Sequence, residues 1–225
     1  MKIRSTTVFA RLTLPPDRAQ IAELADVAAA AREALTFAGY EVQTARLATD
    51  LFPVLARPEH APHALELVEE LEALCQDQGF EYLALGPAGA DMQPLVAEIL
   101  QSTQSVFATC HIAPPGLGTV DGRTVKQAAQ IMRKAALLEE GFGNLRFAAL
   151  ANVPPGTPFF PAAYWTEEGP AFGIATESAD LAVEACSGAE DAAAAHDRLV
   201  SSITTHGQRI TETAQALSQK HGVRF

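Results

Sequence analysis

Short apolar segments alternate along the chain with longer segments in which apolar residues return every three or four positions. The short segments, at 5–14, 40–47, 80–85, 105–111, 145–153 and 171–176, are typical of buried strands. The longer ones predict helices between Asp17 and Gly39, around 67–75, up to Leu100, over 123–139 and over 190–221. Strands that alternate with helices in this way predict βαβ units, an α/β fold and a mostly parallel sheet.

No low-complexity linker divides the chain, so we expect a single α/β domain over residues 1–225. Small residues on both faces of segment 145–153 predict a strand covered on both sides. Gly222 is expected to end the last helix, and 223–225 have the character of a strand that is beginning. This favours a chain that is the N-terminal part of a longer fold. Because an uncovered sheet edge promotes aggregation, we also expect a second copy or a second chain to complete the sheet.

The net charge of the chain indicates which partners to expect, and its cysteine content indicates the compartment. The chain has 27 acidic and 16 basic residues and a net charge of −11, which repels nucleic acid. No apolar run is long enough to predict a membrane-spanning helix. Three widely spaced cysteines without a Cys-x-x-Cys motif favour a reduced, cytoplasmic protein.

A stiff aromatic segment follows the strand predicted at 145–153. Residues 154–165, here called the aromatic loop, contain four prolines together with Phe159, Phe160, Tyr164 and Trp165. Proline fixes φ and removes backbone donors, so the loop cannot continue a helix or a sheet ladder. The loop is predicted to form a pocket wall or a subunit contact. A structural crossover that buries its own aromatic side chains is the alternative.

Polar residues stand at the ends of three successive predicted strands, at His111, Asn152 and Glu177. Ligands of open α/β sheets bind beyond the carboxyl ends of strands, so we expect these side chains to share a site. His111 and Glu177 are the candidates for acid–base catalysis. The candidates for substrate binding are Asn152, Arg146, Tyr164, Asp180 and Cys110. Cys110 and His111 point to opposite strand faces, and a buried cysteine is the alternative for Cys110.

Other motifs are weaker candidates for a cofactor or metal site. Gly116-Leu117-Gly118-Thr119-Val120-Asp121-Gly122 is one residue too long for the dinucleotide fingerprint, and a plain loop is the simpler interpretation. His60 and His63 lack a third ligand nearby. His196 and His206 lie about 15 Å apart along one helix and cannot share a metal. We therefore predict no metal site, and the sequence identifies no cofactor.

Residues 141–154, 158–164 and 177–181 together resemble the family called domain of unknown function 711, a match that extends mainly over 141–184. Members of that family are similar in fold to pyruvate formate-lyase, a barrel of two parallel half-sheets wrapped by helices. The resemblance implies a half-barrel here. It implies no glycyl-radical chemistry, because the chain has neither an adjacent cysteine pair nor a glycyl loop.

Two functions of different classes follow from these patterns. The first is an enzyme or small-molecule-binding protein with a pocket at the carboxyl ends of the strands. The second is a non-catalytic structural or assembly subunit, in which the aromatic loop and the long C-terminal helix form an interface.

Overall fold

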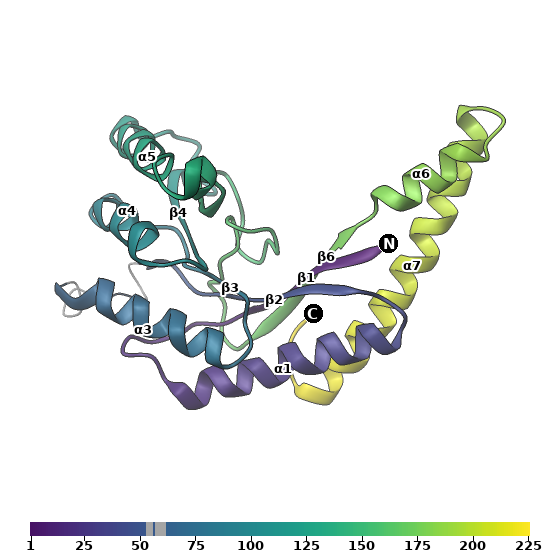
Figure 1. Cartoon of the computed structure of the whole chain (residues 1–225), viewed down its shortest axis with the longest axis horizontal. Helices are drawn as coiled ribbons and strands as arrows, with labels where there is room; N and C mark the ends of the chain where they lie inside the picture. The colour runs from purple at the N-terminus through teal and green to yellow at the C-terminus, as the bar shows by residue number, and fades with distance from the viewer. Residues whose placement is uncertain (53–55, 57–61) are drawn as a thin grey trace.

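The computed structural model describes residues 1–52, 56 and 62–225 and confirms the α/β fold class. Six strands form one mostly parallel, strongly curled half-barrel sheet that is surrounded by helices (Figure 1). The strands are β1 (Lys2–Phe9), β2 (Val42–Ala48), β3 (Tyr82–Ala84), β4 (Val106–Ala113), β5 (Phe147–Ala151) and β6 (Ala171–Glu177).

The strand order is β5-β4-β3-β2-β1-β6. All neighbours from β1 to β5 run parallel, whereas β6 runs antiparallel to β1 and pairs Phe9 with Ala171 and Lys2 with Glu177. The carboxyl ends of β1 to β5 therefore lie at one edge of the half-barrel, here called the C-terminal rim. Because its direction is reversed, β6 begins at this rim and ends at the opposite, N-terminal rim.

Helices cover one face of the sheet, called here the outer face (Figure 1). They are α1 (Arg18–Phe37), α3 (Ala64–Asp77), α4 (Gln93–Ser102) and α5 (Gly122–Ala135). Their apolar residues join strand residues such as Val8, Leu47 and Leu83 in one core. The inner face carries a smaller cluster that includes Phe9, Ala48 and Trp165, so the aromatic loop supplies part of its cover.

Several element boundaries differ from the expectations. The first strand ends at Phe9 and not at residue 14, and β5 is an edge strand that pairs with β4 alone among the described residues. The sequence patterns did not predict η2 (Glu139–Arg146) or α6 (Ala179–Ser187). Asp17 caps the first turn of α1, since its Oδ1 accepts from the Ala19 backbone amide at 2.9 Å. The beginning strand at the C-terminus is confirmed by a bridge between Ala171 and Arg224.

The long helix α7 (Ala192–His221) packs unevenly along its length. Its buried residues are Ile210, Ala214 and Leu217, all in the half that lies against the body. Figure 1 shows the other half leaving the body together with α6, so that the two helices form a projecting hairpin. Asp191 caps the first turn of α7, with its Oδ1 accepting from the Ala194 amide at 2.8 Å.

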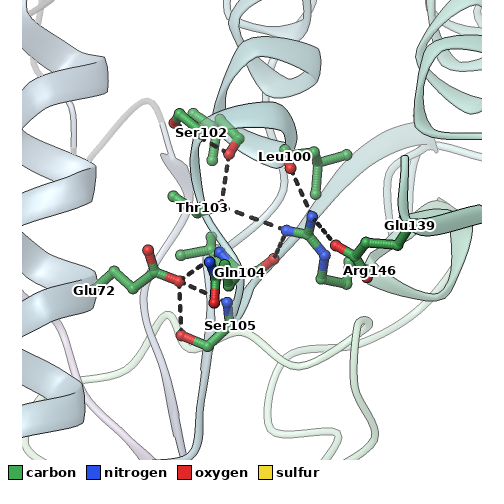
Figure 2. Close-up of polar contacts among 10 residues, drawn as sticks. Glu72, Leu100, Ser102, Thr103, Gln104, Ser105, Glu139 and Arg146 are labelled. Carbon is green, nitrogen blue, oxygen red and sulfur yellow. Dashed lines mark hydrogen bonds and ion pairs between the residues drawn. The ribbon is translucent and has the colours of Figure 1, made fainter. Parts of the chain in front are cut away.

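One buried carboxylate joins α3 to the segment between α4 and β4 (Figure 2). Glu72 is only 9% exposed. Its Oε1 accepts from the backbone amides of Gln104 at 2.9 Å and Ser105 at 2.6 Å, and from the Ser105 hydroxyl at 2.8 Å. These bonds satisfy donors that would otherwise be buried without a partner, and they hold the start of β4 against α3.

Glu72→Ala is expected to lower the free energy of unfolding by about 3 kcal/mol, because it leaves buried backbone donors unsatisfied and removes a charge-assisted bond. Urea unfolding measures this change. The matched control is Glu70→Ala, an exposed position on the same helix, which should stay within about 0.5 kcal/mol of the wild type. Equal effects of the two substitutions would contradict the role given to Glu72.

Candidate functional site

A cavity of about 410 Å³ lies at the C-terminal rim. Its wall comes from the segments that follow β2, β3 and β4 and from the first turn of α5. Most of the lining is apolar, and His111, Thr119, Asp121 and Thr124 supply the polar side chains. This is the composition of a small-molecule pocket, an apolar concavity with a few polar groups.

His111, near the end of β4, is the predicted site residue that lies in this cavity. The side chain is half-buried, and burial lowers its pKa from the usual 6.5. Its Nδ1 is buried without a hydrogen-bond partner among the described residues. The imidazole is therefore neutral near pH 7, and one of its nitrogens can accept a proton or a hydrogen bond.

Tyr164 stands behind His111. The two rings meet edge to face with centroids 5.6 Å apart, and the Tyr164 hydroxyl donates to the Val153 carbonyl at 2.8 Å. The Tyr164 hydroxyl is thus already bonded to the backbone just before the aromatic loop. The ring of Tyr164 supports His111, and its hydroxyl is not directed at a ligand. The structure thus brings two of the predicted site residues together at the rim.

The aromatic loop lies over the inner face near the same rim. The Trp165 amide donates to the Thr49 carbonyl at 2.9 Å, and its ring packs 5.5 Å from that of Phe9. Phe160 packs against Phe107 of β4 at 5.3 Å. Tyr164 and Trp165 are buried, as in a crossover that buries its own aromatic side chains, whereas Phe159 is 61% exposed. A subunit contact of this loop stays a prediction, and Phe159 is the aromatic residue that remains available for it.

Asn152 lies at the same rim as His111 and directly follows β5. Its backbone N–H donates to the Ala113 carbonyl at 2.8 Å, which joins it to the end of β4. The backbone has a positive φ of 55°, a conformation that asparagine adopts more readily than most residues. Its side chain is exposed and does not line the cavity.

Glu177 and Asp180 do not join His111, so the expectation of a three-residue site is wrong. Glu177 pairs in register with Lys2 at the N-terminal rim, and its carboxylate contacts the Arg4 guanidinium at 3.0 Å. Asp180 lies in the first turn of α6, just beyond it. The physical reason is that β6 runs antiparallel to β1, which carries its carboxyl end away from the other strand ends.

Arg146 is buried and holds neighbouring segments of the chain together (Figure 2). It is 5% exposed and immediately precedes β5, at the end of that strand opposite Asn152. Its guanidinium donates to the Leu100 carbonyl at 2.6 Å and the Val106 carbonyl at 3.2 Å, and pairs with Glu139 at 2.7 Å. It therefore caps the last turn of α4 and cannot reach the cavity at the other rim.

Cys110 lies in the helix-covered core, fully buried among apolar residues of the outer face. Burial raises the pKa of its thiol to about 11, so the thiol stays protonated and unreactive near neutral pH. The expectation of a substrate contact from Cys110 is not supported by this position, and its adjacency to His111 has no chemical consequence because the two side chains point to opposite faces.

The sequence reasoning missed Asp50, which follows β2 at the C-terminal rim. It is 3% exposed, its Oδ1 has no hydrogen-bond partner among the described residues, and its Oδ2 lies 3.6 Å from Arg11 Nε. Burial raises its pKa above the usual 3.8, and Arg11 offsets part of this effect. Gly86 packs so closely that an added Cβ would lie 2.0 Å from the Asp50 carbonyl oxygen. Like His111, Asp50 is a polar residue at the end of a predicted strand, and the same sequence pattern could have identified it.

Within the described residues no three His, Cys, Asp or Glu side chains gather in a group that could hold a metal ion. His60 lies outside those residues, and His63 is exposed beside Glu66. In the same part of the chain, no helix combines the length and apolar content needed to cross a bilayer.

Asp50→Asn is expected to make the protein more stable than the wild type at pH 7.5. Because the folded-state pKa is raised, ionisation of Asp50 costs folding free energy as the pH rises through that pKa, and the substitution removes this cost. The advantage should shrink as the pH falls toward 3.8, the usual carboxyl value. Urea unfolding at several pH values measures it, with the exposed Asp26→Asn as control. A less stable Asp50→Asn at pH 7.5 would show instead that the Arg11 pair dominates.

Comparisons with known proteins bear on the resemblance noted in residues 141–184. The chain is 29% identical over 136 residues to a UPF0210 protein from Pyrobaculum islandicum, an alignment that covers 56% of this chain and 29% of the relative. The likeness to the pyruvate formate-lyase barrel stays a prediction. The model of the family described as Uncharacterised ACR (DUF711) matches residues 1–225, so the chain belongs to this family.

Proposed function

We propose that the chain binds a small, largely apolar molecule in the cavity at the C-terminal rim and that His111 makes the polar contact. The observation that carries this proposal is the position of a half-buried, neutral imidazole in the wall of an apolar cavity of about 410 Å³. Parallel sheets commonly bind ligands at this rim, where backbone and side-chain groups of several strands converge.

The chemistry of the wall restricts the ligand. Asp121 is the charged residue of the lining, and its Oδ1 already accepts from the Arg123 amide at 2.9 Å. A neutral ring or short apolar chain with one hydrogen-bonding group fits better than a phosphorylated molecule, which would meet a net charge of −11. A neutral His111 can also accept a proton from the ligand, so the same geometry serves a binding protein or an enzyme that uses it as a base.

Fragments with one uncharged ring and one hydrogen-bonding group are expected to bind the wild-type protein. A fragment at a hundred times its Kd stabilises the folded state by about 2.7 kcal/mol, which thermal shift detects. His111→Phe keeps the ring that packs on Tyr164 and removes both nitrogens. We expect it to weaken the best fragments about tenfold, equivalent to about 1.4 kcal/mol.

Two control variants accompany this test. His196→Phe makes the same exchange at an exposed position of α7 and should leave fragment binding unchanged. Thr119→Trp places a large ring in the cavity wall and should abolish binding. Fragments that bind the Trp variant as well as the wild type would refute the proposed cavity.

The second candidate is an assembly subunit, which the projecting hairpin of α6 and α7 favours. Val183 is 64% exposed, Val200 49% and Ile203 43%, so apolar side chains of both helices face solvent. We propose that a second copy of the chain covers these residues, as expected for a homo-oligomer. The free edge of β5 is the other place where a second chain could extend the sheet.

Ile203→Glu is expected to shift the oligomer equilibrium toward the monomer by about tenfold or more, because it places a charge in an apolar contact. Light scattering over a range of protein concentrations measures the shift. Thr204→Glu, an exposed polar neighbour on the same helix, is the control. A wild-type protein that stays monomeric at high concentration would contradict this second function.

A further inference from the structure

We propose a second ligand site on the inner face of the sheet, where Arg46 binds the carboxylate of a small anionic molecule. Arg46 lies on β2, level with Thr7 of β1 and Tyr82 of β3. The site shares no residue with the lining of the cavity beside His111. It therefore does not depend on the function proposed above.

The Arg46 side chain is held in place by groups that carry no negative charge. Its guanidinium carbon lies 5.1 Å from the centroid of the Phe160 ring and 5.5 Å from that of Tyr82. Its Nε donates to the Thr44 hydroxyl at 2.9 Å, while that hydroxyl donates to the Arg4 carbonyl at 2.9 Å. Cation–π contacts and one hydrogen bond thus fix the plane of the guanidinium. No acceptor contacts its two terminal nitrogens within the described residues.

Arg46 forms no ion pair within the described part of the chain. Six other arginines there form ion pairs with carboxylates, namely Arg4, Arg11, Arg32, Arg123, Arg146 and Arg224. Arg46 forms none, although acidic residues outnumber basic ones by 27 to 16. Burial lowers its pKa from the usual 12.5; Tyr82 and Glu81 offset part of this effect, and the positive charge of Arg4 adds to it. A half-buried cation without a counter-ion costs free energy, and a bound anion relieves this cost.

A carboxylate fits the free edge of this guanidinium. The free edge of a guanidinium offers two parallel N–H donors that match the two oxygens of a carboxylate. Phe160 and Tyr82 contact the guanidinium, and Phe107 packs edge to face on both rings, at 5.3 Å and 5.2 Å. Such aromatic surroundings favour a ligand whose carboxylate is attached to a flat apolar body.

The probe for this site is benzoate, a planar carboxylate on an aromatic ring. Benzoate is expected to raise the melting temperature of the wild-type protein in a dose-dependent manner and to move the Nε–Hε NMR signal of Arg46. Arg46→Met should lose both effects. Arg46→Lys keeps the charge but not the two parallel donors, and should bind benzoate at least tenfold more weakly.

The controls separate this site from general charge effects and from the cavity at the rim. Arg133→Met removes the same charge from an exposed position of α5 and should leave benzoate binding unchanged. His111→Phe should also leave it unchanged, so failure of one site does not imply failure of the other. Thr44→Val removes the acceptor of Arg46 Nε and provides a milder variant, expected to weaken benzoate, if Arg46→Met does not fold.

Three results would overturn the proposal. The first is a wild-type Arg46 signal that does not move with benzoate. The second is an equal thermal shift in wild type and Arg46→Met, which would place benzoate elsewhere. The third is protection by inorganic phosphate that equals or exceeds that by benzoate, which would refute a carboxylate as the ligand class.

Discussion

The order of the parallel strands is the constraint on which the rest of this structure depends. From β1 to β5 each strand lies beside its predecessor in the chain, and crossovers of the usual right hand then place every connecting helix on the same side of the sheet. Figure 1 shows this one-sided cover by α1, α3, α4 and α5. The inner face receives no helix from these crossovers, so another part of the chain has to cover its apolar side chains.

The aromatic loop covers the inner face at the C-terminal rim. Its proline and aromatic residues suit it to this position. Its prolines prevent helix and ladder formation, and its aromatic rings supply a large apolar area from a short segment. Trp165 covers Phe9, and Tyr164 supports His111 at the edge of the rim cavity. Further along the inner face, Phe160 stacks on Arg46. One loop thus completes the inner core and also shapes the surroundings of both proposed sites.

At the N-terminal rim, buried charged side chains hold backbone segments together. Arg146 and Glu72 each satisfy backbone groups where α4 ends and β4 begins, from opposite sides of the same segment (Figure 2). At the C-terminal rim, Asp50 and His111 each keep a buried polar atom without a partner among the described residues. Arg146 Nε also lacks a partner among the described residues, so unpaired buried polar atoms occur at both rims; those of His111 and Asp50 stand out because they lie at the carboxyl ends of the parallel strands.

Local sequence determined the six strands and the longer helices, though not η2 or α6, because helical and strand periodicity reflect burial on one side or both sides of a segment. It also identified the aromatic loop and placed His111 and Asn152 at one rim, since parallel strands share a direction. Tertiary structure alone decided the rest. The antiparallel direction of β6 separated Glu177 from His111, and the packing of α4 took Arg146 into the core. Strand direction and long-range contacts arise between segments distant in sequence, so no local pattern along the chain encodes them.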